Sequence, residues 1–251
     1  MVDKIVQNEK KILDHIYRYR ITTLNVVNNY LFPEKSKQDV KKLYRSLRDK
    51  GLVKSASLHP HEHYYFLTEK ASASVYRNKF KNVSGFLTEH QLLEKYSMLV
   101  FCCLQDVKRM KYTIDELQKN FPDLLSKNIP ANNYFKDTNK GKPVIGWLKI
   151  DLGFNYERVA QRIYPILKKR LSNVSWSYII QQGSFIITIA TGWKSKAQKL
   201  REFIGDKDKF RQNIYNNLNR DFNFDLYKFE KIPIKVSVCE IPEIKPFVPK
   251  K

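Results

Sequence analysis

The segment 36–51 constrains the fold of this chain more than any other. It begins at Ser36, a residue type that caps helix N-termini, and ends at Gly51, a residue type that commonly follows a helix. Between them, apolar residues recur at helical spacing on one stripe, and basic and amide side chains occupy another. The apolar stripe consists of Val40, Leu43, Tyr44 and Leu47. The segment therefore predicts a helix over 36–50 with one buried face and one basic face.

Two further helices and two strands are predicted around this segment. Apolar spacing predicts a helix around 12–17 and a second one over 22–31. Residues 52–54 and 63–67 are typical of two strands joined by a polar turn. Three helices followed by a β-hairpin is the order of a winged helix-turn-helix domain, which we expect over residues 1–80 with its elements in 8–72.

A second domain is predicted over 86–240, after a polar linker at 79–85. Its expected helices are 88–104, a short one from the capping pattern at Thr113, 156–171, 194–204 and 209–218, and its expected strands are 134–136, 144–150, 177–181, 184–190 and 232–238. The proline-bearing tail, 241–251, is predicted to be an extended arm. The fold class is thus α+β, with an α/β second domain.

The charge of the chain indicates a polyanionic partner. Lys and Arg number 46 against 25 Asp and Glu, a formal net charge of +21. No apolar run is long enough to span a bilayer and the N-terminal residues are polar, so we expect neither membrane insertion nor a signal peptide. The 3 Cys fit neither a disulfide framework nor a zinc-ligand spacing. These features predict a cytoplasmic protein without a metal or cofactor.

The predicted basic helix carries the candidate binding residues. Gln38 and Arg45 have side chains that can pair bidentately with adenine or guanine, and neighbouring lysines and Arg48 can neutralise phosphates. Lys54 and Tyr64 on the hairpin are further candidates, although Tyr64 could equally pack onto the helix. The predicted DNA-binding set is Lys35, Lys37, Gln38, Lys41, Lys42, Arg45, Arg48, Lys54 and Tyr64. The alternative is a solvated basic face in a winged helix that contacts other proteins.

The run His59-Pro60-His61-Glu62-His63 resembles a metal-binding pattern, because imidazoles on alternate residues of a strand share one face. No Cys or second carboxylate cluster accompanies it. The run also falls where the tip of the wing is expected. Solvation or weak contact with phosphate is therefore the favoured interpretation.

The order of elements, together with several short motifs, resembles the replication-relaxation family of plasmids and integrative elements, which is related to MobC-type mobilisation relaxases. The motifs are Tyr30-Leu31-Phe32-Pro33, the basic helix ending in Leu47–Val53, Tyr65–Ala71, His90, Ile129–Phe135 and Gly146–Gly153. The resemblance covers most of the chain. It implies that the second domain has a restriction-endonuclease-like fold, with Pro-Asp on one strand and an acidic pair on the next.

The chain departs from that family where metal ligands are needed. Ala131 follows Pro130, where the resemblance implies an aspartate, and Lys149 stands where an acid is expected before Asp151. Alanine cannot ligate Mg²⁺ and an ammonium group repels it, so Asp151 is a poor site even with Asp137 nearby. A different register could bring in Asp123. Without a metal, Asp151 is expected to be a surface or helix-capping carboxylate, and no catalytic residue is predicted.

Together these features predict a double-stranded DNA-binding protein of a mobile element or phage. Replication initiation, mobilisation and transcriptional control are its expected roles, acting as a homodimer with an inactive nuclease-like domain. Two alternatives stay open: an active Mg²⁺-dependent nickase or relaxase, and an adaptor that binds protein or structured RNA. Basic residues of the second domain extend the predicted DNA track: Arg158, Arg162, Lys168, Lys169, Arg170, Lys194, Lys196, Lys199 and Arg201.

Overall fold

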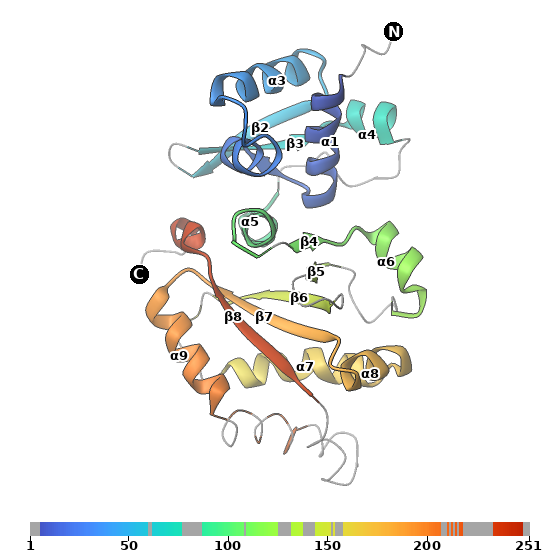
Figure 1. The fold of residues 1–251 in the computed structure, drawn as a ribbon, viewed down its shortest axis with the longest axis vertical. Helices are drawn as coiled ribbons and strands as arrows, with labels where there is room; N and C mark the ends of the chain where they lie inside the picture. Colours follow the sequence, from blue (N-terminus) through green and yellow to red (C-terminus); the bar gives the residue numbers. More distant parts are fainter. Residues whose placement is uncertain are drawn as a thin grey trace. The chain divides into compact units, whose positions relative to one another are not determined.

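The computed structural model of the chain describes residues 6–59, 62–76, 87–107, 109–124, 132–137, 144–151, 153, 158–206, 210, 212, 214, 216–217 and 233–247. Helices and strands are mixed along these residues, which confirms the α+β class (Figure 1). The chain forms two compact units. Unit 1 comprises Met1–Asp106 and Pro246–Lys251, and unit 2 comprises Val107–Lys245.

Unit 1 combines helices with a small antiparallel sheet. Its elements are α1 (Gln7–Tyr19), β1 (Thr22–Thr23), α2 (Leu24–Val26) with the π-helical turn η1 (Val27–Leu31), α3 (Lys37–Asp49), β2 (Val53–His59), β3 (Glu62–Leu67), α4 (Glu69–Tyr76) and α5 (Glu89–Cys103). The sheet is 3-stranded in the order β1-β3-β2. The three predicted helices and both predicted strands of this region are present, but Thr22 and Thr23 form β1, so the second helix begins at Leu24 and not at residue 22. The turn at Pro60 lies outside the described residues.

The core of unit 1 is built from the apolar stripes that the sequence indicates. Ile12, Leu13 and Ile16 of α1 pack with the buried face of α3 and with the strands. A buried ion pair adds to these contacts, because Nζ of Lys50 lies 2.7 Å from Oε2 of Glu9, whose side chain is 2% exposed. Burial alone would raise the pKa of Glu9, but hydrogen bonds from Lys50, Ser46 and the Val6 amide lower it.

Helix α5 belongs to unit 1 and not to the second domain that the sequence predicts. It is buried along most of its length, and Sγ of Cys103 lies 3.6 Å from Nε2 of His15 on α1. The Tyr96 hydroxyl donates to Glu62 on β3 at 3.5 Å. A helix with this much apolar surface needs neighbours on several sides, and in unit 1 it finds them on α1 and the hairpin. The polar stretch 79–85, predicted as the linker, lies outside the described residues.

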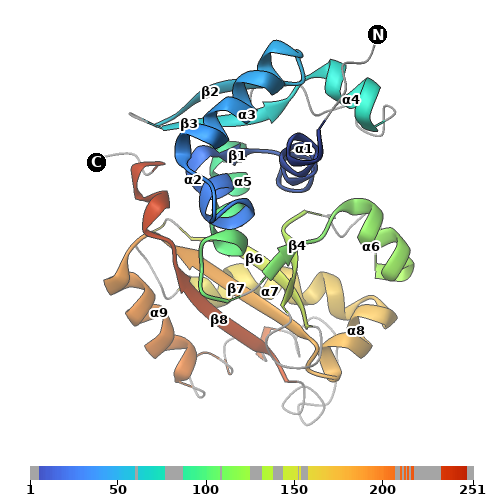
Figure 2. The ribbon, with the colours of Figure 1, turned by 45° about the horizontal axis from the view of Figure 1, so that its top comes forward.

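Unit 2 contains a mixed sheet with helices packed against it (Figures 1 and 2). The sheet is 5-stranded in the order β4-β5-β6-β7-β8, with β5 antiparallel to β4 and β6, and with β6, β7 and β8 parallel. Its strands are β4 (Arg109–Lys111), β5 (Tyr134–Asp137), β6 (Val144–Ile150), β7 (Phe185–Thr191) and β8 (Lys235–Glu240). The described helices are α6 (Ile114–Asn120), η2 (Pro122–Leu124), α7 (Val159–Leu171), α8 (Val174–Gln181), α9 (Lys194–Gly205) and η4 (Pro242–Phe247). Residues 209–218, predicted as a helix, are described only in part.

Two predictions for this region are wrong. Residues 177–181 belong to helix α8 and not to a strand, because the Asn173 side chain caps the helix and accepts from the Trp176 amide at 3.0 Å. The start of the tail is not extended, because 242–247 form the 3₁₀ helix η4. Buried Ile244 anchors this turn, and proline is compatible with the first turn of a helix because its φ is already fixed there.

Candidate functional site

Helix α3 presents the exposed basic surface that the sequence predicts. The Ser36 hydroxyl accepts from the Asp39 amide at 3.2 Å, which fixes the start of the helix. Val40, Tyr44 and Leu47 are buried, and this orients the remaining side chains outwards. The outward set comprises Lys37, Gln38, Lys41, Lys42, Arg45 and Arg48, all of which are exposed.

Most of these cations are not neutralised by a neighbouring acid. Lys42 is paired with Asp39, with Nζ 3.1 Å from Oδ1. In the part of the chain that the structure describes, no carboxylate forms an ion pair with Lys37, Lys41, Arg45 or Arg48, which are spaced four, four and three residues apart. This spacing places them along one stripe of the helix. The stripe is a surface that attracts an anionic partner.

The predicted Lys35 lies beside α3 but is already engaged. Its Nζ lies 3.9 Å from Oε1 of Glu34 and 5.7 Å from the centroid of the Phe32 ring. It is half-buried, unlike the cations of the stripe. Lys35 therefore contributes less to the exposed charge than the sequence indicates.

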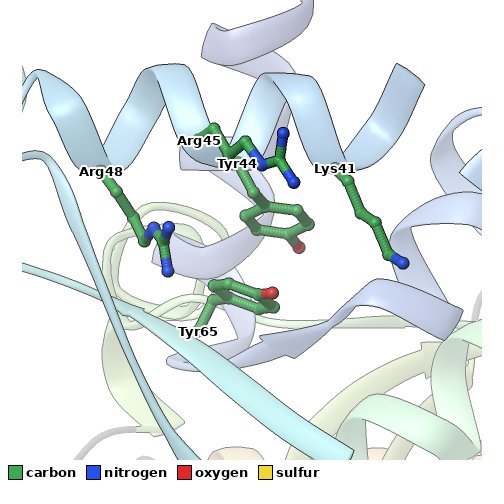
Figure 3. A pocket seen from close by; sticks show the side chains of 5 residues that line it. All are labelled: Lys41, Tyr44, Arg45, Arg48 and Tyr65. Atoms are coloured by element: carbon green, nitrogen blue, oxygen red, sulfur yellow. The ribbon is translucent and has the colours of Figure 1, made fainter. Parts of the chain in front are cut away.

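A shallow pocket opens between α3 and β3 (Figure 3). It has a volume of about 280 Å³ and is lined by Lys41, Tyr44, Arg45, Arg48 and Tyr65. The rings of Tyr44 and Tyr65 stack with centroids 3.8 Å apart and an interplanar angle of 20°. Burial raises the pKa of both phenols, although Arg48 opposes the shift at Tyr65. Both hydroxyl groups are therefore neutral at physiological pH, and the hydroxyl of Tyr65 can donate a hydrogen bond.

On the hairpin, the aromatic residue that faces α3 is Tyr65 and not the predicted Tyr64. Tyr64 is 3% exposed and packs beside Phe66 on the face of the sheet turned away from α3. Lys54 pairs opposite Phe66, so it shares that face even though it is exposed. Tyr65, which was not predicted, faces α3. Side chains alternate along a strand, and counting by two from buried Leu67 would have selected Tyr65.

The histidine run does not form a metal site among the residues that are described. Nε2 of His59 lies 3.1 Å from Oε2 of Glu62, and the His59 ring meets Phe247 edge-on, with centroids 6.2 Å apart. His63 is exposed and His61 lies outside the described residues. His59 therefore contributes to the packing of unit 1.

The second candidate site, around Asp151, is occupied by internal cations. Asp151 follows β6 and its side chain is 1% exposed, so the prediction of a surface carboxylate is wrong, and its Oδ1 accepts from the Gly153 amide at 3.3 Å. Nζ of Lys196 lies 2.8 Å from its Oδ2, and Arg162 donates to its Oδ1. Lys196 also donates to the carbonyl oxygens of Asp151 and Gly153. These contacts place two cations against the carboxylate, and their charge disfavours a bound metal ion there.

The other acidic residues considered for a metal site lie elsewhere in unit 2. Asp137 pairs opposite Val144 in the sheet, about 23 Å along β6 from Asp151 at ~3.3 Å per residue, and forms an ion pair with Arg109. Asp123 is exposed, and its backbone carbonyl accepts from the side chain of Asn173. Asn173 follows the C-terminal end of α7, whereas Arg162 lies near the N-terminal end of that helix. Lys149 is half-buried on β6, and Ala131 lies outside the described residues. These acids therefore do not converge.

Several basic residues of unit 2 are not available for a DNA track. Arg162 and Lys196 are engaged by Asp151. Arg170 is 3% exposed and donates to the Tyr134 hydroxyl. Its guanidinium lies 5.3–5.4 Å from the centroids of four aromatic rings, those of Tyr134, Trp147, Trp176 and Phe185. Apart from Arg162, which is exposed but paired with Asp151, the exposed members of the predicted set are Arg158, Lys168, Lys169, Lys194, Lys199 and Arg201.

Comparison of the chain with protein-family models, curated proteins and solved structures finds no match. Among the described residues, no helix combines the length and apolar character needed to span a bilayer.

Proposed function

We propose that unit 1 is a winged-helix domain that binds double-stranded DNA with α3 in the major groove. The observation that carries this proposal is the stripe of exposed cations on α3 that lacks acidic partners in the described structure. A helix followed by a two-stranded hairpin supports it, because the recognition helix and wing of such domains follow in that order. Neutralising phosphates releases counterions and provides affinity that falls with salt.

Sequence selectivity in this proposal comes from side chains that can reach base edges. Gln38 suits adenine and Arg45 suits guanine, since each can form two hydrogen bonds with that base in the major groove. Lys37, Lys41 and Arg48 contact phosphates and position the helix. A homodimer would place two such helices on half-sites about one helical turn apart.

We further propose that unit 2 is a nuclease-like domain that does not cleave DNA. The burial of Asp151 against Lys196 and Arg162 supports this role, because Mg²⁺ would have to displace two cations already in contact with its ligand. The resemblance to the replication-relaxation family suggests a mobile-element or phage context. Replication initiation, mobilisation and transcriptional control are the proposed processes.

The test is selection of the full-length chain on randomised duplex DNA, followed by sequencing. We expect an enriched motif, and we expect Arg45→Ala to weaken binding to that motif by about 1–3 kcal/mol and to relax one base position. Equal weakening on all sequences would show that Arg45 contacts only phosphate. Lys42→Ala is the matched control, because Lys42 is an exposed cation of the same helix that is already paired with Asp39.

Two parallel incubations separate the alternatives. Supercoiled plasmid with Mg²⁺ should stay intact, and nicked plasmid would favour a relaxase. Structured RNA should compete less well than duplex DNA. Retention of RNA but not of duplex at physiological salt would contradict the proposed function.

A further inference from the structure

The pocket between α3 and β3 differs chemically from the rest of the basic stripe. Lys41, Arg45 and Arg48 line it, and the stacked rings of Tyr44 and Tyr65 form a rigid aromatic part of its lining (Figure 3). Among the described residues, no carboxylate lines it. The charged side chains therefore all favour an anion, and the Tyr65 hydroxyl adds a neutral donor.

The size of the pocket indicates that it holds one group of a larger molecule and not a whole small ligand. Its volume of about 280 Å³ lies just below the ~300 Å³ at which pockets for small ligands usually begin. Arginine guanidinium groups match phosphate geometry because they donate two parallel hydrogen bonds. A phosphate group that is carried by an extended backbone fits these donors better than an enclosed metabolite does.

We propose that this pocket holds one phosphate of the DNA backbone against Arg48 and the hydroxyl of Tyr65, which leaves Arg45 for the base edge. The proposal rests on the proposed function and adds a specific anchor to it. The cations belong to α3 and Tyr65 belongs to β3, so a single phosphate would contact the helix and the hairpin together. Such a contact fixes the register of α3 in the groove, as phosphate contacts do in general.

The variant that tests this anchor is Tyr65→Phe. Phenylalanine keeps the ring stacked on Tyr44 and removes only the hydroxyl donor. We expect about a tenfold loss of affinity for the selected duplex, the size of a weak charge-assisted hydrogen bond, with unchanged thermal unfolding. Arg48→Ala should also reduce the slope of log affinity against log salt by about 1.

A scan of single methylphosphonate substitutions along the duplex identifies the phosphate. For the wild-type chain, one position should cause a large loss. That loss should shrink in Tyr65→Phe, because both changes remove the same contact, and should persist in the Lys42→Ala control. If every position stays as sensitive in Tyr65→Phe as in the wild type, the anchor does not exist although DNA binding stands.

Titration with inorganic phosphate tests the pocket without DNA. In the wild-type chain, we expect the NMR signals of the Tyr65 ring and of the Arg48 side chain to shift. In Tyr65→Phe, the Arg48 signals should shift less. Shifts without any binding of duplex would support the phosphate pocket and contradict the proposed function. Absence of shifts, together with an unaltered methylphosphonate scan, would overturn the pocket.

Discussion

Replacement of Asp151 by alanine is expected to lower the free energy of unfolding of unit 2 by about 3 kcal/mol, because removing one partner from a buried ion pair leaves the other charge unpaired. The side chains of Asp151 and Lys196 are 1% and 10% exposed. Without the carboxylate, the partners that the described residues leave to the ammonium of Lys196 are the backbone carbonyls of residues 151 and 153. Burial lowers the pKa of Lys196, and Asp151 opposes that shift. Loss of Asp151 therefore increases the cost of keeping a charged ammonium group buried at this position.

Urea unfolding followed by tryptophan fluorescence measures this effect in the full-length chain. All 3 tryptophans, at 147, 176 and 193, lie in unit 2. Arg162→Ala is the matched control and should cost at most about 1 kcal/mol, because its side chain is 40% exposed. The double variant Asp151→Leu with Lys196→Met should recover much of the stability, since neither charge is then buried alone.

Two outcomes would count against this account of Asp151. If Asp151→Ala unfolded at the wild-type urea concentration, the buried pair would contribute nothing. If Mg²⁺ stabilised the wild-type chain but not Asp151→Ala, the carboxylate would be a metal ligand and the proposal of an inactive nuclease-like domain would fail.

Helix α3 could be predicted closely because its determinants are local. The Ser36 cap precedes the first turn, and Gly51 adopts a φ of 68° just after the end of the helix, a conformation that favours glycine. The same holds for α6, where Thr113 and Glu116 form the capping box that the sequence indicates. Such signals lie within a few residues of the boundary they set, so they can be read without tertiary information.

The sequence could have shown which hairpin side chains face α3, but only with the correct alternation of side chains along the strand. A shift by one residue moves every side chain to the other face. Tyr64 is the candidate named from the sequence, whereas buried Leu67 and Val53 fix Tyr65 on the side of α3. The pocket was missed for this reason, since Tyr65 is its contribution from β3.

The environment of Asp151 depends on residues far away in the sequence. Arg162 lies on α7 and Lys196 on α9, and nothing near Asp151 indicates that either would reach it. The place of α5 has a similar cause, because its partners His15 and Glu62 precede the polar stretch that indicated a boundary. Pairings of this kind are decided by packing and not by local pattern.

Unit 1 is expected to lose stability in acid because of the buried side chain of His15. Its ring is buried between Tyr19 and Tyr30, with centroids 4.7 Å and 5.8 Å away, and its Nε2 lies 3.6 Å from Sγ of Cys103. Burial lowers the pKa of His15 to about 3, and the charge of Arg18 adds to the shift. The folded chain therefore keeps a neutral imidazole over a range in which the unfolded chain, with a pKa near 6.5, takes up a proton.

The sign of the effect follows from this difference in proton uptake. The contribution of His15 is fully present above pH 6.5 and is lost as the pH falls towards 3, at about 1.4 kcal/mol per pH unit. Between pH 6.5 and 4.5 the neighbouring thiol does not titrate, because burial raises the pKa of Cys103 to about 12. The contribution of Glu9, whose folded pKa lies below 4.5, is lost only at lower pH. We therefore expect unit 1 to lose roughly 2 kcal/mol over these two pH units, because the unfolded imidazole is already half protonated at pH 6.5.

Hydrogen exchange of the α1 and α3 amides in the full-length chain, measured between pH 4.5 and 7 and corrected for intrinsic rates, follows unit 1 specifically. His15→Phe keeps an aromatic ring at this position and should flatten the pH dependence, whatever it costs at neutral pH. His63→Phe is the matched control, because His63 is exposed and its replacement should leave the slope unchanged. A slope that survived in His15→Phe would show that another group takes up the proton and that the buried imidazole is not the source of the acid sensitivity.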